Sequence, residues 1–188
     1  MAETDEDIIT RVMGGEQEAF ALLVDRYKDK VFALVMGVLK NRELAEEVAQ
    51  DVFVKVYLSL RKFRNDAKFS TWIYRISYNS AISETRKSSY KNTVLDGQYL
   101  DNVAETKENN DENMIKEEEQ QKLSRAISAL KPDERCILRL YYFEEKAIND
   151  ISRITGLGQS NVKIKLHRMR KKLKSLIEED EYKTLVVN

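Results

Sequence analysis

The sequence predicts an all-α protein of two small helical domains joined by a flexible acidic linker, with a helix-turn-helix in the carboxyl-terminal domain. Apolar residues recur at spacings of three and four along most of the chain, which is typical of helices with one buried face. One proline and six glycines interrupt 188 residues, so the helices are expected to be long. A polar stretch separates two such regions. We place the domains at residues 1–92 and 114–180 and the linker at 93–113.

Three helices are expected in the first sixty residues. Thr4 and Asp7 resemble a capping box that opens a short helix ending at a Gly-Gly pair. Apolar stripes then predict helices over about residues 16–39 and 42–62. The face of the third helix opposite its stripe carries polar side chains, namely Glu43, Glu46, Glu47, Gln50 and Asp51. From the pattern alone, this face is more simply a solvated surface.

Aromatic and basic side chains alternate between Phe63 and Lys91. Aromatic rings offer stacking faces to unpaired bases, and cations follow the phosphate backbone, so the stretch predicts a single-strand nucleic-acid surface. The alternative, which the pattern favours about equally for Trp72 and Tyr74, is that they are core aromatics.

A fourth helix is expected to begin at Ser70, as its N-cap, and to run to about residue 87. Phe69 before the cap and Tyr74 after it would form a hydrophobic staple. Such a staple would hold the loop of residues 64–68 in place, as the recognition of a single base requires.

The second half of the chain predicts a helix-turn-helix. A helical pattern resumes near Ile115, and Pro132 stands where the first turn of the next helix is expected. A short helix over residues 147–154, a glycine-containing break and a basic helix from about Gln159 to Ile177 follow. This layout of two helices and a short turn is that of a major-groove reader.

The charged residues lie in blocks, although the formal net charge is zero. Residues 61–91 carry eight basic and two acidic residues, and residues 163–174 carry seven basic residues and no acidic one. Residues 101–119 carry two basic and eight acidic residues. Because partners respond to the local field, the two basic blocks predict nucleic-acid contacts. The acidic linker is most simply solvated chain, although it would also be able to screen the basic helix in the free protein.

Several other classes of function are disfavoured. Cys136 is the single cysteine, so neither an internal disulfide nor a zinc site is expected, and its apolar surroundings predict a buried, inert thiol. His167 lies among cations, so it does not predict a catalytic base or an enzyme. Neither a signal peptide nor an apolar run of about 18 residues is present. These features predict a cytoplasmic protein without membrane insertion, metal or cofactor.

Three motifs resemble those of the extracytoplasmic-function (ECF) sigma factors, a family of bacterial RNA polymerase initiation factors. They are AEEVAQDVFVKVY (45–57), FSTWIYRISYN (69–79) and LKPDERCILRLYYFE (130–144), the last followed by NVKIKLHRMRKKL (161–173). The resemblance implies that residues 1–92 form a sigma region 2 domain and residues 114–180 a sigma region 4 domain. It also implies three partners: core RNA polymerase, promoter DNA and an anti-sigma factor.

The same resemblance implies a role for individual residues. Those expected to bind core polymerase are Glu47, Gln50, Asp51 and Lys55. Those expected at the minus-ten element are Arg64, Asn65, Lys68, Phe69, Ser70, Trp72, Arg75, Asn79 and Arg86. Those expected at the minus-thirty-five element are Ser160, Asn161, Lys163, Ile164, His167, Arg168, Arg170 and Lys171, with Arg170 and Lys171 on phosphates.

The chain departs from the family pattern at Ser83, at Ser152 and at Ser160-Asn161. The last pair lies on the expected reading surface, so the resemblance does not imply a particular promoter sequence. Two functions of other kinds fit parts of the sequence. A helix-turn-helix regulator that is not a polymerase subunit would explain residues 147–174 but not residues 63–91. The other is a helical adaptor that never meets DNA, which salt-sensitive promoter binding by the complex with polymerase would exclude.

Overall fold

The structure, a computed structural model, describes residues 3–94 and 111–187, and within them it contains only helices and connecting turns. The all-α prediction is therefore confirmed for the described residues. In chain order the elements are α1 (Asp5–Met13), the 3₁₀ turn η1 (Gln17–Ala19), α2 (Phe20–Leu39), α3 (Arg42–Ser59), the 3₁₀ turn η2 (Leu60–Lys62), α4 (Phe69–Val94), α5 (Asp111–Ser128), α6 (Pro132–Tyr142), α7 (Ile148–Thr155) and α8 (Gln159–Val187).

Local sequence signals explain where several of these helices begin. The predicted capping box is present at α1, where the Thr4 hydroxyl accepts a hydrogen bond from the Asp7 amide and the Asp7 carboxylate accepts one from the Thr4 amide. Asn41 caps α3 by accepting a 2.8 Å hydrogen bond from the amide of Leu44. Pro132 is the first residue of α6, as predicted.

The start of α4 differs from the prediction. The amides of Thr71 and Trp72 both donate to the carbonyl of Lys68, so the helix begins at Phe69 and Ser70 is not its cap. Phe69 is therefore part of the first turn, and its fully buried ring packs against Tyr27, Phe63 and Trp72 instead of closing a staple from outside the helix.

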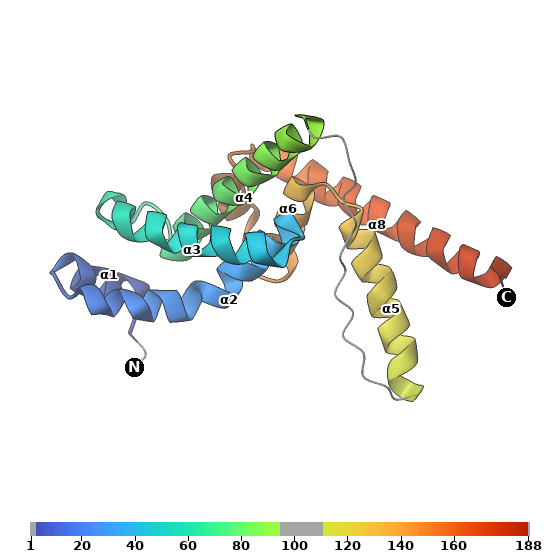
Figure 1. Cartoon of the computed structure of the whole chain (residues 1–188), viewed down its shortest axis with the longest axis horizontal. Helices are drawn as coiled ribbons and strands as arrows, with labels where there is room; N and C mark the ends of the chain where they lie inside the picture. Colours follow the sequence, from blue (N-terminus) through green and yellow to red (C-terminus); the bar gives the residue numbers. More distant parts are fainter. Residues whose placement is uncertain (1–2, 95–110, 188) are drawn as a thin grey trace.

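In the first domain, α2 runs through the middle and packs against α1, α3 and α4 (Figure 1). In the second domain, α7 and α8 form the predicted helix-turn-helix, with α6 packed on both and α5 beside α8. The turn after α7 depends on Gly156, which caps the helix with φ of 74°, a left-handed conformation that glycine adopts without steric cost.

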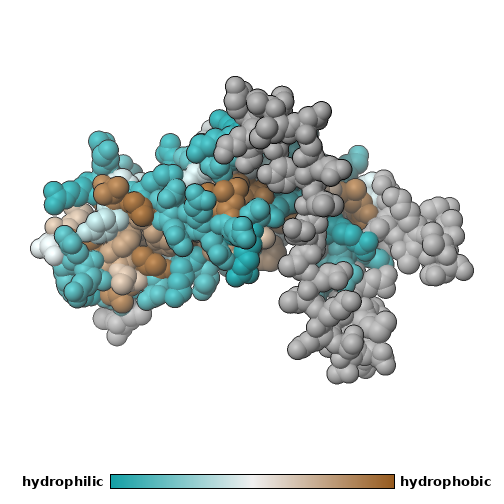
Figure 2. Space-filling view, viewed as in Figure 1, coloured by the Kyte–Doolittle hydropathy of each residue, from teal (hydrophilic) through white to brown (hydrophobic). Residues whose placement is uncertain are grey.

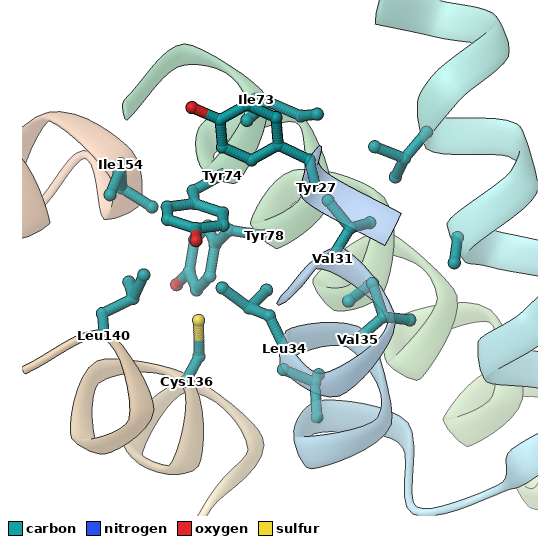
Figure 3. Close-up of a cluster of buried hydrophobic side chains, with 14 of the residues drawn as sticks. Tyr27, Val31, Leu34, Val35, Ile73, Tyr74, Tyr78, Cys136, Leu140 and Ile154 are labelled. Atoms are coloured by element: carbon teal, nitrogen blue, oxygen red, sulfur yellow. The ribbon is translucent and has the colours of Figure 1, made fainter. Parts of the chain in front are cut away.

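The two domains pack directly against each other. Helix α6 lies on α2, and α7 lies on α4. Figure 3 shows Cys136, Leu140 and Ile154 of the second domain facing Leu34, Tyr74 and Tyr78 of the first, and all six side chains are buried. The described buried residues of both domains therefore form one continuous hydrophobic core.

The predicted linker lies partly outside the described residues, which exclude 95–110. Helix α4 extends to Val94 rather than stopping near residue 87, and α5 already begins at Asp111. Both helices thus enter the segment assigned to the linker from its two ends. The suggestion that the acidic stretch screens the basic helix falls largely on residues that are not described.

Candidate functional site

The loop between η2 and α4, residues 63–68, rests on a cluster of aromatic rings. The ring centroids of Phe63 and Phe69 are 5.7 Å apart, and that of Trp72 lies 5.2 Å from Phe63 and 5.8 Å from Phe69. Asn65 has φ of 58°, a left-handed conformation in which asparagine is more often found than most residues. The aromatic cluster therefore fixes a sharp loop whose polar side chains face outward.

The residues predicted at the minus-ten element are brought together at this loop and along one stripe of α4. Arg64, Asn65 and Lys68 are exposed on the loop. Farther along α4, the half-buried Trp72 is followed by exposed side chains at helical spacing, namely Arg75, Asn79 and Arg86. Two members differ: Phe69 is fully buried and supports the loop from beneath, and Ser70 is only partly exposed.

The turn between α6 and α7, residues 143–147, lies against the start of α4. Nζ of Lys146 donates a 2.8 Å hydrogen bond to the hydroxyl of Ser70 and lies 5.2 Å from the centre of the Tyr74 ring. The Tyr74 hydroxyl donates a 2.6 Å hydrogen bond to Oε2 of Glu144. These contacts join residues 70 or more positions apart, and no local pattern in the sequence predicts them.

Burial changes the acid–base properties of these contacts. Burial, followed by the hydrogen bond to the Glu144 carboxylate, strongly raises the pKa of Tyr74, so its hydroxyl remains a donor over the whole physiological range. Burial lowers the pKa of Lys146, although the carboxylates of Asp150 and Glu144 oppose that effect. The turn thus presents a partly desolvated cation and a carboxylate to the base of the loop.

Helix α8 carries the second basic surface. Val162, Leu166 and Met169 are buried and fix which face of the helix is turned inward. The opposite face exposes most of the residues predicted to contact the minus-thirty-five element, namely Ser160, Asn161, Lys163, Ile164, His167, Arg168 and Lys171. Side chains at the amino-terminal end of a recognition helix are the ones that reach base edges in the major groove. Ile164, which is 47% exposed, would offer an apolar contact of the kind that a thymine methyl accepts.

Not every cation of the basic block is available to a ligand. Lys165 forms a 2.8 Å ion pair with Asp133, and Lys172 donates to the carbonyl of Ala129. Arg170, which was predicted to hold phosphate, donates a 2.6 Å hydrogen bond from Nε to the hydroxyl of Tyr142. The structure therefore divides the block into cations that hold the domain together and an outward set around Lys163, Arg168 and Lys171.

The predicted protein-binding residues of α3 also share one face. Glu47, Gln50 and Asp51 are exposed at spacings of three and four, and Lys55, also exposed, donates a 3.0 Å hydrogen bond to the hydroxyl of Ser80 on α4. Helices α6 and α7, by contrast, pack on α2 and α4.

Two exposed apolar residues of α3 were not among the residues predicted to bind polymerase. Val54 is 56% exposed and Leu58 is 75% exposed, and they continue the stripe of residues 47, 50 and 51 along α3. Figure 2 shows hydrophobic surface among the hydrophilic residues on the side of the molecule where α1, α2 and α3 lie. Neighbouring exposed apolar side chains that are rimmed by charged ones are typical of a protein-binding surface. The positions of Val54 and Leu58, opposite the buried stripe, were the signal available in the sequence.

Metal-binding side chains and the single cysteine were also compared with their predictions. The described residues include no trio of His, Cys, Asp or Glu placed to hold a metal ion. Cys136 is buried, and burial raises the pKa of its thiol, as expected for an unreactive cysteine. None of the helices in residues 3–94 and 111–187 combines the length and hydropathy that crossing a bilayer requires.

Comparison with known protein families finds a match for each of the two domains. Residues 23–90 match the Sigma-70 region 2 family, and residues 120–173 match the Sigma-70 region 4 family. The chain is 31% identical to the ECF RNA polymerase sigma factor SigW of Bacillus subtilis, with 91% of this chain and 95% of the relative covered. It is 30% identical to the ECF RNA polymerase sigma-E factor of Escherichia coli K12, covering 93% and 95%.

Two solved structures share the fold at 20% identity. The sigma factor RpoE, solved in complex with the anti-sigma factor NepR from Bartonella quintana, aligns with a TM-score of 0.71 over 85% of this chain and 96% of that one. CnrH, solved in complex with the cytosolic domain of CnrY, aligns with a TM-score of 0.68 over 95% and 99%. With two sigma regions in order and full-length relatives at 30% identity or more, the chain belongs to the family of ECF RNA polymerase sigma factors.

Proposed function

We propose that this ECF sigma factor binds core RNA polymerase through the exposed face of α3 and positions it on promoters through two DNA surfaces. The outward face of α8 reads the duplex at the minus-thirty-five element. The loop of residues 63–68 and the stripe along α4 hold an unpaired base at the minus-ten element. As a sigma factor, the protein directs transcription initiation and supplies no catalytic group of its own.

The main support for this proposal is that each of the two domains has one basic surface facing outward. The loop offers exposed cations above an aromatic cluster, a combination that suits an extruded base and its phosphates. Helix α8 offers cations, amide and hydroxyl groups on one face, a combination that suits base edges and phosphates in the major groove. A single duplex-reading surface would be enough for an ordinary repressor.

The free energy of strand opening explains why base capture needs the other two contact surfaces. Extruding a base costs a few kcal/mol in lost stacking and pairing. Contacts of α3 with polymerase and of α8 with the upstream element offset that cost, because they bring the loop to the DNA as part of a larger complex. We therefore expect weak promoter binding by the free factor and salt-sensitive binding by the complex with core polymerase.

An anti-sigma factor is the expected regulator, since both solved structures above are complexes with such a partner or with a cytosolic protein domain. The polymerase that sigma factors serve is cytoplasmic, and we place the action of this chain there. The promoter sequence would be read by the outward face of α8, where Ser160 and Asn161 depart from the usual family pattern.

Run-off transcription with purified core polymerase on a library of promoter templates tests the proposal. We expect defined start sites with the wild-type protein and their loss when the α3 face is altered by Gln50→Ala with Asp51→Arg. Lys28→Ala, on the exposed surface of α2, is the matched control and is expected to leave transcription unchanged. Specific promoter binding without polymerase, and no transcription with it, would instead support a helix-turn-helix regulator.

A further inference from the structure

Ile164 is the one exposed large apolar side chain of α8 among the residues that the structure describes, and it is 47% exposed. The apolar side chains that fix the inward face of this helix, Val162, Leu166 and Met169, are at most 3% exposed. With 3.6 residues per turn, Ile164 points away from all three and stands at the centre of the outward face. Packing within the domain therefore does not explain why this position is apolar.

The side chains around Ile164 are polar and exposed. Ser160, Asn161, His167 and Arg168 neighbour it at spacings of three and four along the helix. None of these four side chains has a hydrogen-bond or ion-pair partner in the part of the chain that the structure describes. The outward face is thus a set of polar groups that the protein itself does not use, arranged around one apolar side chain.

The major groove of DNA offers such a surface only one apolar group. Every base pair presents nitrogen and oxygen donors or acceptors there, and thymine adds its C5 methyl group. An isoleucine pressed against the polar edges would leave them without hydrogen-bond partners, whereas against the methyl it buries apolar surface on both sides. Because isoleucine in a helix strongly prefers one χ1 rotamer, the contact costs little side-chain entropy. The chemistry of the groove therefore matches Ile164 to thymine.

From this geometry we infer that Ile164 is a specificity-determining residue, which selects a thymine of the upstream element by its methyl group. Arg168 lies one turn farther along the same side of α8, or about 6 Å along the helix. Since base pairs are about 3.4 Å apart, the thymine lies within about two base pairs of the one that Arg168 contacts. The inference rests on the proposed function, because that function places α8 at the minus-thirty-five element.

Replacement of thymine by deoxyuridine tests the inference, because it removes the methyl group and leaves the hydrogen-bonding groups of the base pair unchanged. The full-length factor is assembled with core polymerase, and promoters are selected from a template library by run-off transcription. Each thymine of the upstream element, on either strand, is then replaced in turn by deoxyuridine.

The proteins compared are wild type, Ile164→Ala, Ile164→Val and Lys171→Ala. Ile164→Val is the conservative variant and keeps a branched apolar side chain. Lys171→Ala is the matched control, because it removes an exposed cation of the same face that is expected to hold phosphate. Unchanged far-ultraviolet circular dichroism establishes that each variant is folded.

With the wild type at subsaturating polymerase, we expect deoxyuridine at one upstream position to lower the initiation rate about fourfold, the effect of burying one methyl group. Ile164→Ala should initiate equally well on the two templates, whereas Ile164→Val should keep most of the difference. Lys171→Ala should lower initiation on both templates by the same factor, because a phosphate contact does not distinguish between bases.

Three results would overturn the inference: selected upstream elements without thymine, a wild type that is indifferent to deoxyuridine at every upstream position, or an Ile164→Ala variant as sensitive as the wild type. Transcription in any of these cases leaves the proposed function in place. Absence of transcription from every template would instead overturn the proposed function, on which the inference rests.

Discussion

Arg135 reaches from the second domain to the end of α2, where its Nε donates a 2.6 Å hydrogen bond to the carbonyl of Gly37. The same guanidinium donates to the carbonyl of Val38 and, on its own side, to that of Leu130 just beyond α5. The last carbonyls of a helix have no partner within it. One side chain therefore satisfies carbonyl groups at the ends of helices in both domains.

Replacing Arg135 by Ala is expected to lower the free energy of unfolding by about 2 kcal/mol, because several half-buried carbonyls lose a charged donor. Urea unfolding followed by circular dichroism measures this change. Lys28→Ala removes an exposed ion pair with Asp25 and is expected to change stability by less than about 0.5 kcal/mol. Equal effects of the two substitutions would contradict the capping role.

Substitution by alanine is expected to change the stability of the protein in opposite directions at two glycines. Gly156 has φ of 74°, so Gly156→Ala strains the turn of the helix-turn-helix and should destabilise the protein by about 1 kcal/mol or more. Gly37 lies within α2 with open space where a Cβ would stand, so Gly37→Ala should stabilise it by about 0.5–1 kcal/mol. Thermal unfolding measures both changes, and a shift of the melting temperature in the same direction would be evidence against this account.

The exposed apolar residues of α3 are expected to contribute to polymerase binding. Leu58→Asp should weaken binding to core polymerase at least tenfold, because a charge would replace an apolar contact, while stability should change little at a side chain that is 75% exposed. Pull-down titration with core polymerase measures the affinity. Leu22→Asp, at an exposed position on α2, is the control, and comparable losses for both variants would argue against a specific surface on α3.

The cations of α8 are expected to separate into two functional sets. Arg168→Ala should reduce discrimination between promoters at one or two base pairs of the upstream element by about 1–3 kcal/mol, without loss of stability. Lys165→Ala should instead weaken the packing of α6 on α8, because its partner Asp133 loses an ion pair. Run-off transcription on single-base promoter variants, together with thermal unfolding, distinguishes them. A change of base preference in Lys165→Ala would contradict this division.

The sequence predicted the helices and two of the helix starts well because those features are local. The capping box at Thr4 and the proline at the start of α6 depend on neighbours a few residues away, and both appear as expected. The outward faces of α3 and α8 follow in the same way from the spacing of buried residues. Periodicity reports which side of a helix is buried, and this was sufficient to group the expected binding residues.

The contacts between the two domains could not be predicted from local sequence patterns. The sequence pattern left Tyr74 open between a core position and a DNA contact, and it does not reveal that Tyr74 is buried with its hydroxyl bound to Glu144. The assignment of Ser70 as a cap failed for a related reason: the helix starts two residues earlier, because burial of Phe69 against Tyr27 draws that residue into the first turn. Long-range packing, which a linear pattern does not encode, decides both positions.

The hydroxyl of Ser70 has a consequence for the order of events during initiation. It accepts a 2.8 Å hydrogen bond from Nζ of Lys146, and in the proposed complex the same position lies beside the captured base. A nucleotide held there would compete with Lys146 for this hydroxyl. Capture of the unpaired base would then require the α6–α7 turn to give up its contact with the first turn of α4.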